Sequence, residues 1–228
     1  MNNFDNYVEI DHISRTDFLS RVFTYLGLGL GLSAVGAYAG QYLLPLMGSA
    51  YMFGMLTLVI AEMVLAFMIG HDLERRDTAT VRMMFIFYSL INGMTLSVVL
   101  AVYTAASVLF AFVTTAIVFG CMAIIGKTTK LDLSRFGTLF FTGMIACIVL
   151  SLANLFIFHA SGMEIALCYI ETILFLGLIA YDMQMIDRYY SQAENENYAI
   201  FAALQLELDF INLMLRVLCF FGVRKNDN

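Results

Sequence analysis

The sequence contains seven apolar stretches that are each long enough to cross a lipid bilayer as an α-helix. A bilayer core is about 30 Å thick, and a helix needs roughly 20 residues to span it. Of the 228 residues, 61% are hydrophobic and only 13% are charged, so a soluble fold could not cover this apolar surface. The sequence therefore predicts an all-α membrane protein, a bundle of seven transmembrane helices at residues 20–43, 51–70, 83–104, 106–126, 136–158, 164–186 and 198–221.

The charges of the connecting segments predict the orientation of these spans. Lys and Arg precede the first span and recur in every second loop, whereas the loops at 44–50, near 105 and at 159–163 contain none. Positively charged loops stay in the cytoplasm, so we expect the N-terminus to be cytoplasmic. Seven spans then place the C-terminus outside, although Arg224 and Lys225 oppose this. The expected divisions are a tail at 1–19, a transmembrane domain at 20–222 and a short tail at 223–228.

Composition also argues against several functional classes. The net charge of −6 comes without a basic stripe, which argues against nucleic-acid binding. The three histidines form no HExxH pair, so we expect no metal enzyme and no cofactor. The cysteines have no CxxC spacing and lie in apolar runs, where they are typical of small core residues; they are Cys121, Cys147, Cys168 and Cys219.

The first span contains "GLGLGLSAVGAYAG", in which Gly27 and Gly31, and then Gly36 and Gly40, have GxxxG spacing. Small residues at this spacing let two membrane helices approach closely. A nucleotide-binding glycine loop would need a preceding strand, which is not predicted here. We therefore interpret these glycines as a helix-packing surface.

Ionisable residues inside the spans are the candidate functional groups, because each costs about 2.5–3.5 kcal/mol on insertion scales. In the sixth span, Glu171 and Asp182 are eleven residues apart and share one helical face. In the seventh, Asp209, Asn212 and Arg216 share one stripe, and Glu207 points roughly the other way. The whole set consists of Glu62, Glu171, Asp182, Glu207, Asp209 and Arg216.

The connecting segment between the last two spans, "DRYYSQAENENY" with its flanks, is long enough to let them pack antiparallel with Asp182 facing Asp209. Two carboxylates in a dry site cannot both ionise at low cost, so they would share a proton and respond to pH. When both are ionised they would offer hard oxygen ligands to a cation such as calcium. Simpler interpretations remain open: Asp182 as a solvated helix end, and Asp209 as a static ion pair with Arg216. Glu62 and Glu171 could likewise be protonated carboxyls that only form hydrogen bonds.

The same two stretches carry a resemblance to a known family. "GLIAYDMQMI" resembles the sixth-helix signature, and "LELDFINLMLRVLCFFG" the seventh-helix signature, of the Bax inhibitor-1 (transmembrane Bax inhibitor motif) family. The resemblance implies a seven-helix bundle with the last helix at its centre. It also implies a pH-dependent calcium leak in which Asp182 and Asp209 match the family's paired aspartates. Some bacterial relatives are described as modulating membrane proteolysis, and eukaryotic ones as suppressing cell death.

Around the aspartates the sequence departs from the family pattern. Cys219 stands where calcium-leak members have an arginine, and Arg216 lies one turn earlier. Gly70 or His71 occupies the place of a second-helix basic residue, and Glu62 is displaced by about a turn. The resemblance thus assigns the pH-sensing gate to two aspartates; the candidate supporting groups are Arg216, Asn212, Glu62 and Glu171.

Two other functional classes compete with a leak channel. The chain could be a non-conducting regulator that binds another membrane protein, such as a membrane protease, and then its tail at 1–19 would matter more than the aspartates. Intramembrane aspartyl proteases also use two helical aspartates, but they carry a GxGD motif that this sequence lacks. We therefore expect no enzymatic activity, with the lipid bilayer and a permeant calcium ion as the main partners.

Overall fold

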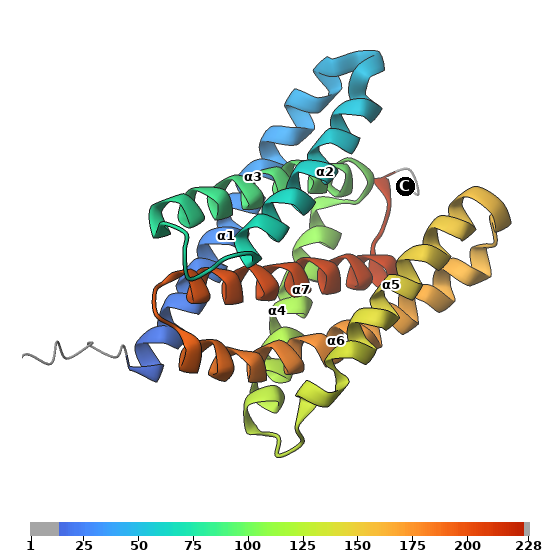
Figure 1. Cartoon of the computed structure of the whole chain (residues 1–228). Helices are drawn as coiled ribbons and strands as arrows, with labels where there is room; N and C mark the ends of the chain where they lie inside the picture. The colour runs from blue at the N-terminus through green and yellow to red at the C-terminus, as the bar shows by residue number, and fades with distance from the viewer. Residues whose placement is uncertain (1–13, 226–228) are drawn as a thin grey trace, which may run out of the picture.

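A computed structural model describes residues 14–225, apart from the side chains of residues 155 and 161. Within this range the chain is helical and forms no strand, which confirms the all-α prediction (Figure 1). Its long helices are α1 (Arg15–Leu43), α2 (Tyr51–Gly70), α3 (Thr78–Val102), α4 (Ala105–Thr128), α5 (Gly137–Ala153), α6 (Ser161–Gln192) and α7 (Asn197–Phe221). Short helical turns join some of them: η1 (Leu44–Ala50), η2 (Leu133–Phe136) and η3 (Asn154–Phe158).

Five segments of the described chain are long and apolar enough to cross a membrane, and the first, Arg15–Gly70, covers both α1 and α2. Each predicted span coincides with a helix, and α2 has the predicted bounds. α7 is not among the five segments, and most of its side chains are buried inside the protein. The protein is therefore an all-α membrane protein, while the count of seven spans stays a prediction.

α7 lies in the middle of the molecule (Figure 1). It packs against α1, α3, α4 and α6 and touches α2, and most of its side chains are buried. The other helices bury fewer residues and turn many large apolar side chains outward. A helix enclosed by protein does not need an apolar surface on every side, so α7 tolerates carboxyl groups that a lipid-facing helix would not.

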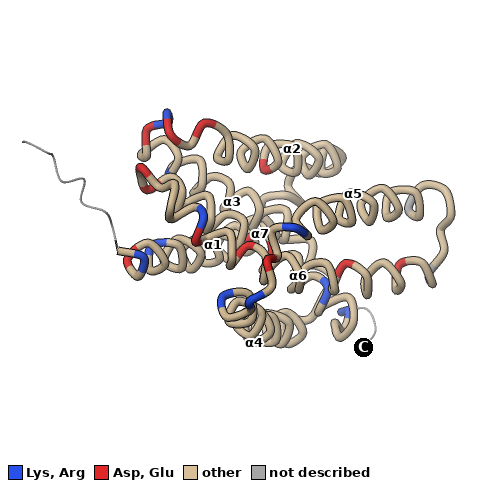
Figure 2. Tube along the Cα trace, turned by 60° about the horizontal axis from the view of Figure 1, so that its bottom comes forward, with Lys and Arg blue, Asp and Glu red and all other residues tan. Residues whose placement is uncertain are grey.

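Two hairpins project from this centre, α1–α2 and α5–α6 (Figure 1). Residues 22–61 and 136–163 contain no Asp, Glu, Lys or Arg, so the tips of both hairpins are uncharged (Figure 2). Gly48 forms the first turn with φ 54° and ψ −121°, a conformation that a side chain would disfavour. His159 closes the second turn in the left-handed region, with φ 51°.

Both ends of α7 are held by specific contacts. At its start, Asn197 Nδ2 donates hydrogen bonds to the carbonyl oxygens of Leu73 (2.8 Å) and Arg76 (2.9 Å), in the α2–α3 loop. Just beyond its end, the carbonyl of Val223 accepts a hydrogen bond from the backbone N–H of Thr104 at 3.1 Å, in the α3–α4 turn. α7 therefore extends between the same two ends of the molecule as α3.

The closest helix packing is between α1 and α3. A Cβ atom at Gly36 would collide with the carbonyl oxygen of Leu90, and one at Gly93 with that of Ser33. Gly40 would similarly meet Ser97 Cβ at 2.9 Å. The helix-packing prediction is confirmed for Gly36 and Gly40. It is wrong for the other predicted pair, Gly27 and Gly31, which face open space because they lie on another side of α1.

The structure describes only part of the two expected tails. Residues 1–13 of the tail at 1–19, and residues 226–228 of the tail at 223–228, lie outside the described residues. Within the described range α1 begins at Arg15, because Ser14 caps it: its hydroxyl accepts a hydrogen bond from the Asp17 N–H at 3.1 Å.

Candidate functional site

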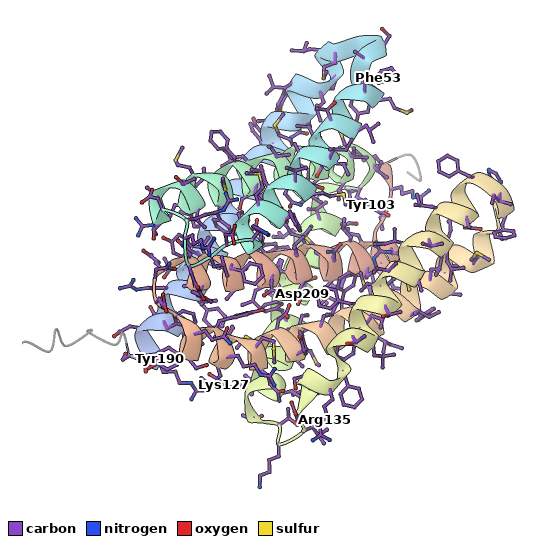
Figure 3. All side chains as sticks on the ribbon, viewed as in Figure 1. Phe53, Tyr103, Lys127, Arg135, Tyr190 and Asp209 are labelled. Atoms are coloured by element: carbon purple, nitrogen blue, oxygen red, sulfur yellow. The ribbon has the colours of Figure 1, made fainter. Side chains whose placement is uncertain are left out.

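The structure brings Asp182 of α6 and Asp209 of α7 within hydrogen-bond reach of each other. Asp209 lies at the middle of the molecule (Figure 3). Their carboxyl groups interact directly, and the two residues are only 6% and 5% exposed. One oxygen of each, Asp182 Oδ1 and Asp209 Oδ2, is buried and has no hydrogen-bond partner among the described residues. Buried polar atoms are rarely left unpaired, so these two oxygens mark a place where a proton or cation would be stabilised.

The helical periodicity of the two helices places the pair in an apolar setting. On α6, Ile179, Met183 and Ile186 are buried beside Asp182, and on α7 Leu206 and Phe210 flank Asp209. α6 continues to Gln192, so the interpretation of Asp182 as a solvated helix end is wrong. Among the described residues no group of three or more His, Cys, Asp or Glu could hold a metal ion, so the pair lacks the ligand set of a resident metal site.

A second contact between the same helices joins Glu171 of α6 to Arg216 of α7 through an ion pair with Arg216 Nη1. The side chain of Glu171 is 9% exposed and that of Arg216 is 28% exposed. The interpretation of Arg216 as a static partner of Asp209 is therefore wrong. The structure instead forms two separate contacts between α6 and α7: a pair of acids and an ion pair.

Two further candidate residues lie apart from the aspartates. The side chain of Asn212 donates to the carbonyl of Leu208 in its own helix at 2.8 Å. Glu62 of α2 accepts hydrogen bonds from Asn92 (3.3 Å) and Thr95 (3.2 Å) of α3. In the described part of the chain, neither side chain forms a hydrogen bond with the acid pair.

Sequence reasoning did not select Glu207 as a site residue, yet it is completely buried. It faces away from Asp209 and forms hydrogen bonds with Ser33 of α1 and Ser89 of α3. A usable signal was present in the sequence: Gly29 and Ser33 on α1, and Ser89 and Gly93 on α3, have the four-residue spacing of a close helix contact. A polar residue in each small-residue stripe points to a polar partner between them.

A polar cavity of about 320 Å³ lies about one turn further along α6 from Asp182. Charged groups surround it, and Asp187 beside it forms a two-pronged ion pair with Arg15 at 2.7 and 2.8 Å. Hydrogen bonds from Ser134, with the charges of Arg135 and Arg188, outweigh the opposing effect of desolvation and lower the pKa of Asp132. This cavity provides polar surroundings close to the acid pair at the end of α6.

Comparison with known proteins extends over nearly the whole chain. A family model described as "Inhibitor of apoptosis-promoting Bax1" matches residues 15–226. The inner membrane protein YbhL of Escherichia coli (strain K12) is 36% identical over 217 residues, which cover 91% of this chain and 92% of YbhL. An uncharacterized protein of Borreliella burgdorferi is 34% identical over 221 residues, covering 93% and 94% of the two chains. An uncharacterized membrane protein of Streptococcus pyogenes serotype M1 is 36% identical over the full length of both chains.

Proposed function

The chain belongs to the Bax inhibitor-1 family, and on that premise we propose that it conducts a calcium leak across the membrane that is gated by pH at Asp182 and Asp209. The observation that carries the proposal is the buried acid pair, in which each residue keeps one oxygen without a partner among the described residues. The proposed activity involves no covalent chemistry, and calcium is its cargo.

The gate follows from the electrostatics of two neighbouring acids. With one shared proton, the pair joins α6 to α7 and closes the contact between them. When both groups are ionised they repel each other, and their oxygens become suitable ligands for a hard cation. The change in protonation is local, but it acts on the packing of α6 against the central helix.

We also propose that the ion pair between Glu171 and Arg216 helps to hold α6 against α7 when the leak is closed. Arg216 lies one turn before Cys219, the position at which the family resemblance implies an arginine. The ion pair joins the same two helices as the aspartates, on the faces that α6 and α7 turn toward each other. In this proposal Glu171 of α6 is the acidic partner of Arg216.

The proposal includes seven spans with a cytoplasmic N-terminus in the inner membrane. In its support, α7 extends from the α2–α3 loop to the α3–α4 turn, as α3 does. The α2–α3 loop contains Arg75 and Arg76, whereas the α3–α4 turn contains no basic residue. Lys225 reaches this uncharged end and donates to the carbonyl of Leu100 at 2.7 Å, which accounts for one of the two C-terminal charges.

Calcium entry into liposomes that contain the purified protein tests the proposal, over about pH 6 to 8, a range that a carboxyl reaches when burial and a neighbouring charge raise its pKa by several units. We expect a pH-dependent flux in the wild type and a flux that no longer responds to pH in Asp182→Asn and Asp209→Asn. Glu164→Gln, which removes an exposed carboxyl from the same helix α6, is the matched control and should behave as the wild type. Absence of flux at every pH in folded protein would reject the leak and favour a non-conducting regulator of another membrane protein.

A further inference from the structure

α7 carries two buried carboxyl groups at nearly the same depth but on opposite faces. Asp209 faces α6, whereas Glu207, two residues earlier, is turned by roughly 200° and faces α1 and α3. Glu207 is 0% exposed, so the protein alone determines its protonation state. α1 also approaches closely here, because a Cβ atom at Gly29 would collide with the Glu207 carboxyl.

The hydrogen-bond contacts of Glu207 can be counted hydrogen by hydrogen. Ser33 Oγ lies 2.8 Å from Glu207 Oε1 and 2.9 Å from the backbone carbonyl oxygen of Ser89. Ser89 Oγ lies 3.0 Å from Glu207 Oε2. A serine hydroxyl has a single hydrogen, and a carbonyl oxygen only accepts. Ser33 can therefore satisfy both of its contacts only when Glu207 supplies a hydrogen.

With a proton on Glu207 the contacts form a closed ring. The Glu207 O–H donates to Ser33 Oγ, the Ser33 hydroxyl donates to the Ser89 carbonyl, and the Ser89 hydroxyl donates back to Glu207 Oε2. A charged Glu207 would leave one of these contacts without a hydrogen. Since unsatisfied buried groups are costly, the ring favours the neutral acid.

No cation compensates Glu207 within the part of the chain that the structure describes. From α1 and α3 the two serines contact Glu207. The Tyr88 hydroxyl of α3 is buried nearby and has no hydrogen-bond partner among the described residues. The charged groups on the other helices around α7 are engaged elsewhere: Glu62 with Asn92 and Thr95, Asp182 with Asp209, and Glu171 with Arg216. Between its ends, α4 contributes no charged group. An isolated carboxylate at this depth is strongly disfavoured.

The neighbouring cavity supplies no solvent to compensate for this. It holds about 170 Å³ between α1, α3, α4 and α7, and Ser33 is the single polar residue among the described residues that line it. Water is poorly stabilised in such an apolar space, since it needs two or more polar partners. Ser33, the residue through which Glu207 adjoins this cavity, therefore faces an apolar space there.

We propose that Glu207 is a second proton-binding site, distinct from the aspartate pair, whose bound proton joins α7 to α1 and α3 through Ser33 and Ser89. Loss of the proton breaks the ring and places an uncompensated charge between the three helices. The packed protein then binds one proton more at this site than the unfolded chain does. Its stability accordingly falls as the pH rises. The inference concerns protonation and packing and does not depend on calcium flux.

Infrared difference spectra of the membrane-reconstituted protein test this assignment directly. We expect the wild type minus Glu207→Gln spectrum at neutral pH to contain a carboxylic-acid C=O band. The matched control is Glu164→Gln, whose difference should contain carboxylate bands because Glu164 is exposed. Ser33→Ala should shift the acid band to higher frequency, since it removes the acceptor of the Glu207 proton. A Glu207 difference that contains only carboxylate bands from about pH 5 to 9, well above the ordinary range of Glu, would overturn the proposal.

Thermal unfolding gives an independent measurement in the same samples. The side-chain amide introduced by Glu207→Gln supplies the hydrogen that the ring needs, so this variant should fold and should match the wild type at acidic pH. As the pH rises, the wild type should lose thermal stability relative to Glu207→Gln. Parallel pH profiles for the two proteins would also contradict the assignment. Both readouts are independent of the flux assay. Absence of calcium flux would not contradict the protonation of Glu207, and a charged Glu207 would not contradict calcium flux.

Discussion

The ion pair between Glu171 and Arg216 is stable only while both partners are present. Glu171 is nearly enclosed, and Arg216 Nε is already buried without a partner in the described part of the chain. Removing one charge leaves the other uncompensated in a weakly polar setting, which typically costs about 3–5 kcal/mol, whereas neutralising both has a much smaller effect. The arrangement thus stabilises the α6–α7 contact in a strongly non-additive way.

A double-mutant cycle tests this coupling. We expect Glu171→Gln and Arg216→Gln to lower stability by about 3 kcal/mol each and the double variant to recover at least half of the combined loss. Thermal unfolding of the detergent-purified proteins provides the measurement. Additive losses in the double variant would show that the two side chains contribute independently.

At the residue scale, the sequence predicted pairs on neighbouring helices better than partners on distant ones. Helical spacing, together with a connecting segment long enough for antiparallel packing, allowed Asp182 to face Asp209, and the structure brings the two together. The partners of Glu207 are 174 and 118 positions away, on α1 and α3, and spacing within α7 cannot identify them. Arg216 pairs with Glu171 and not with Asp209 because of the rotation of α6 about its own axis. Residue spacing along α7 does not determine that rotation.

At the scale of elements, α1 and α3 form the tightest contact in the molecule. Gly36 and Gly93 have no room for even one methyl group, because a backbone carbonyl of the other helix lies in the way. Backbone cannot move aside as a flexible side chain does, so added atoms must push the helices apart. The same contact positions Ser33 and Ser89 around Glu207.

A matched pair of substitutions on α1 tests this packing. We expect Gly36→Ala to lower stability by about 1–3 kcal/mol through overpacking. Gly27→Ala meets open space, so it should be neutral or slightly stabilising, as expected for an added helix former. Thermostability measured by size-exclusion chromatography distinguishes the two. Equal effects would contradict the close approach at Gly36.

GxxxG spacing identified both glycine pairs on α1 but could not choose between them. Which face of α1 meets α3 depends on the arrangement of the whole bundle, and the two pairs differ in rotation about the helix axis. Helix positions were easier to predict, because the length of each apolar run depends on bilayer thickness alone. α7 is not among the helices selected by length and apolar composition, and it is also the helix with most of its side chains enclosed by protein.

At the scale of the whole molecule, Glu196 connects the start of α7 to two other helices. Its carboxylate accepts a hydrogen bond from Tyr25 at 2.8 Å and forms ion pairs with Arg82 and, at 4.0 Å, Arg21. Partial burial acts to raise the pKa of Glu196. The hydrogen bonds from Tyr25 and Arg82 and the nearby positive charges outweigh that effect and lower it. Stability from this group is thus present above the ordinary carboxyl range and is lost as the pH falls through the lowered pKa.

Acidification should therefore weaken the wild type more than Glu196→Gln. We expect Glu196→Gln to lose about 1.5–3 kcal/mol at neutral pH, the range for hydrogen bonds to charged groups. The difference should shrink below about pH 4, where Glu is ordinarily protonated. Thermal unfolding as a function of pH is the measurement. Glu194→Gln, which alters an exposed acid two residues away, is the control, and an identical profile in both variants would refute the role of Glu196.

The central position of α7 has a consequence for biogenesis. This helix follows the other six along the chain, so the ribosome completes it after they have emerged. Until then Ser33, Ser89 and Asp182 have no partner on α7, and the helices that surround it have nothing to close around. Insertion into the bilayer and assembly of the core are thereby separated in time. A nascent chain stalled before residue 197 would be a membrane-inserted set of helices without a centre, and so a recognisable substrate for quality-control proteolysis.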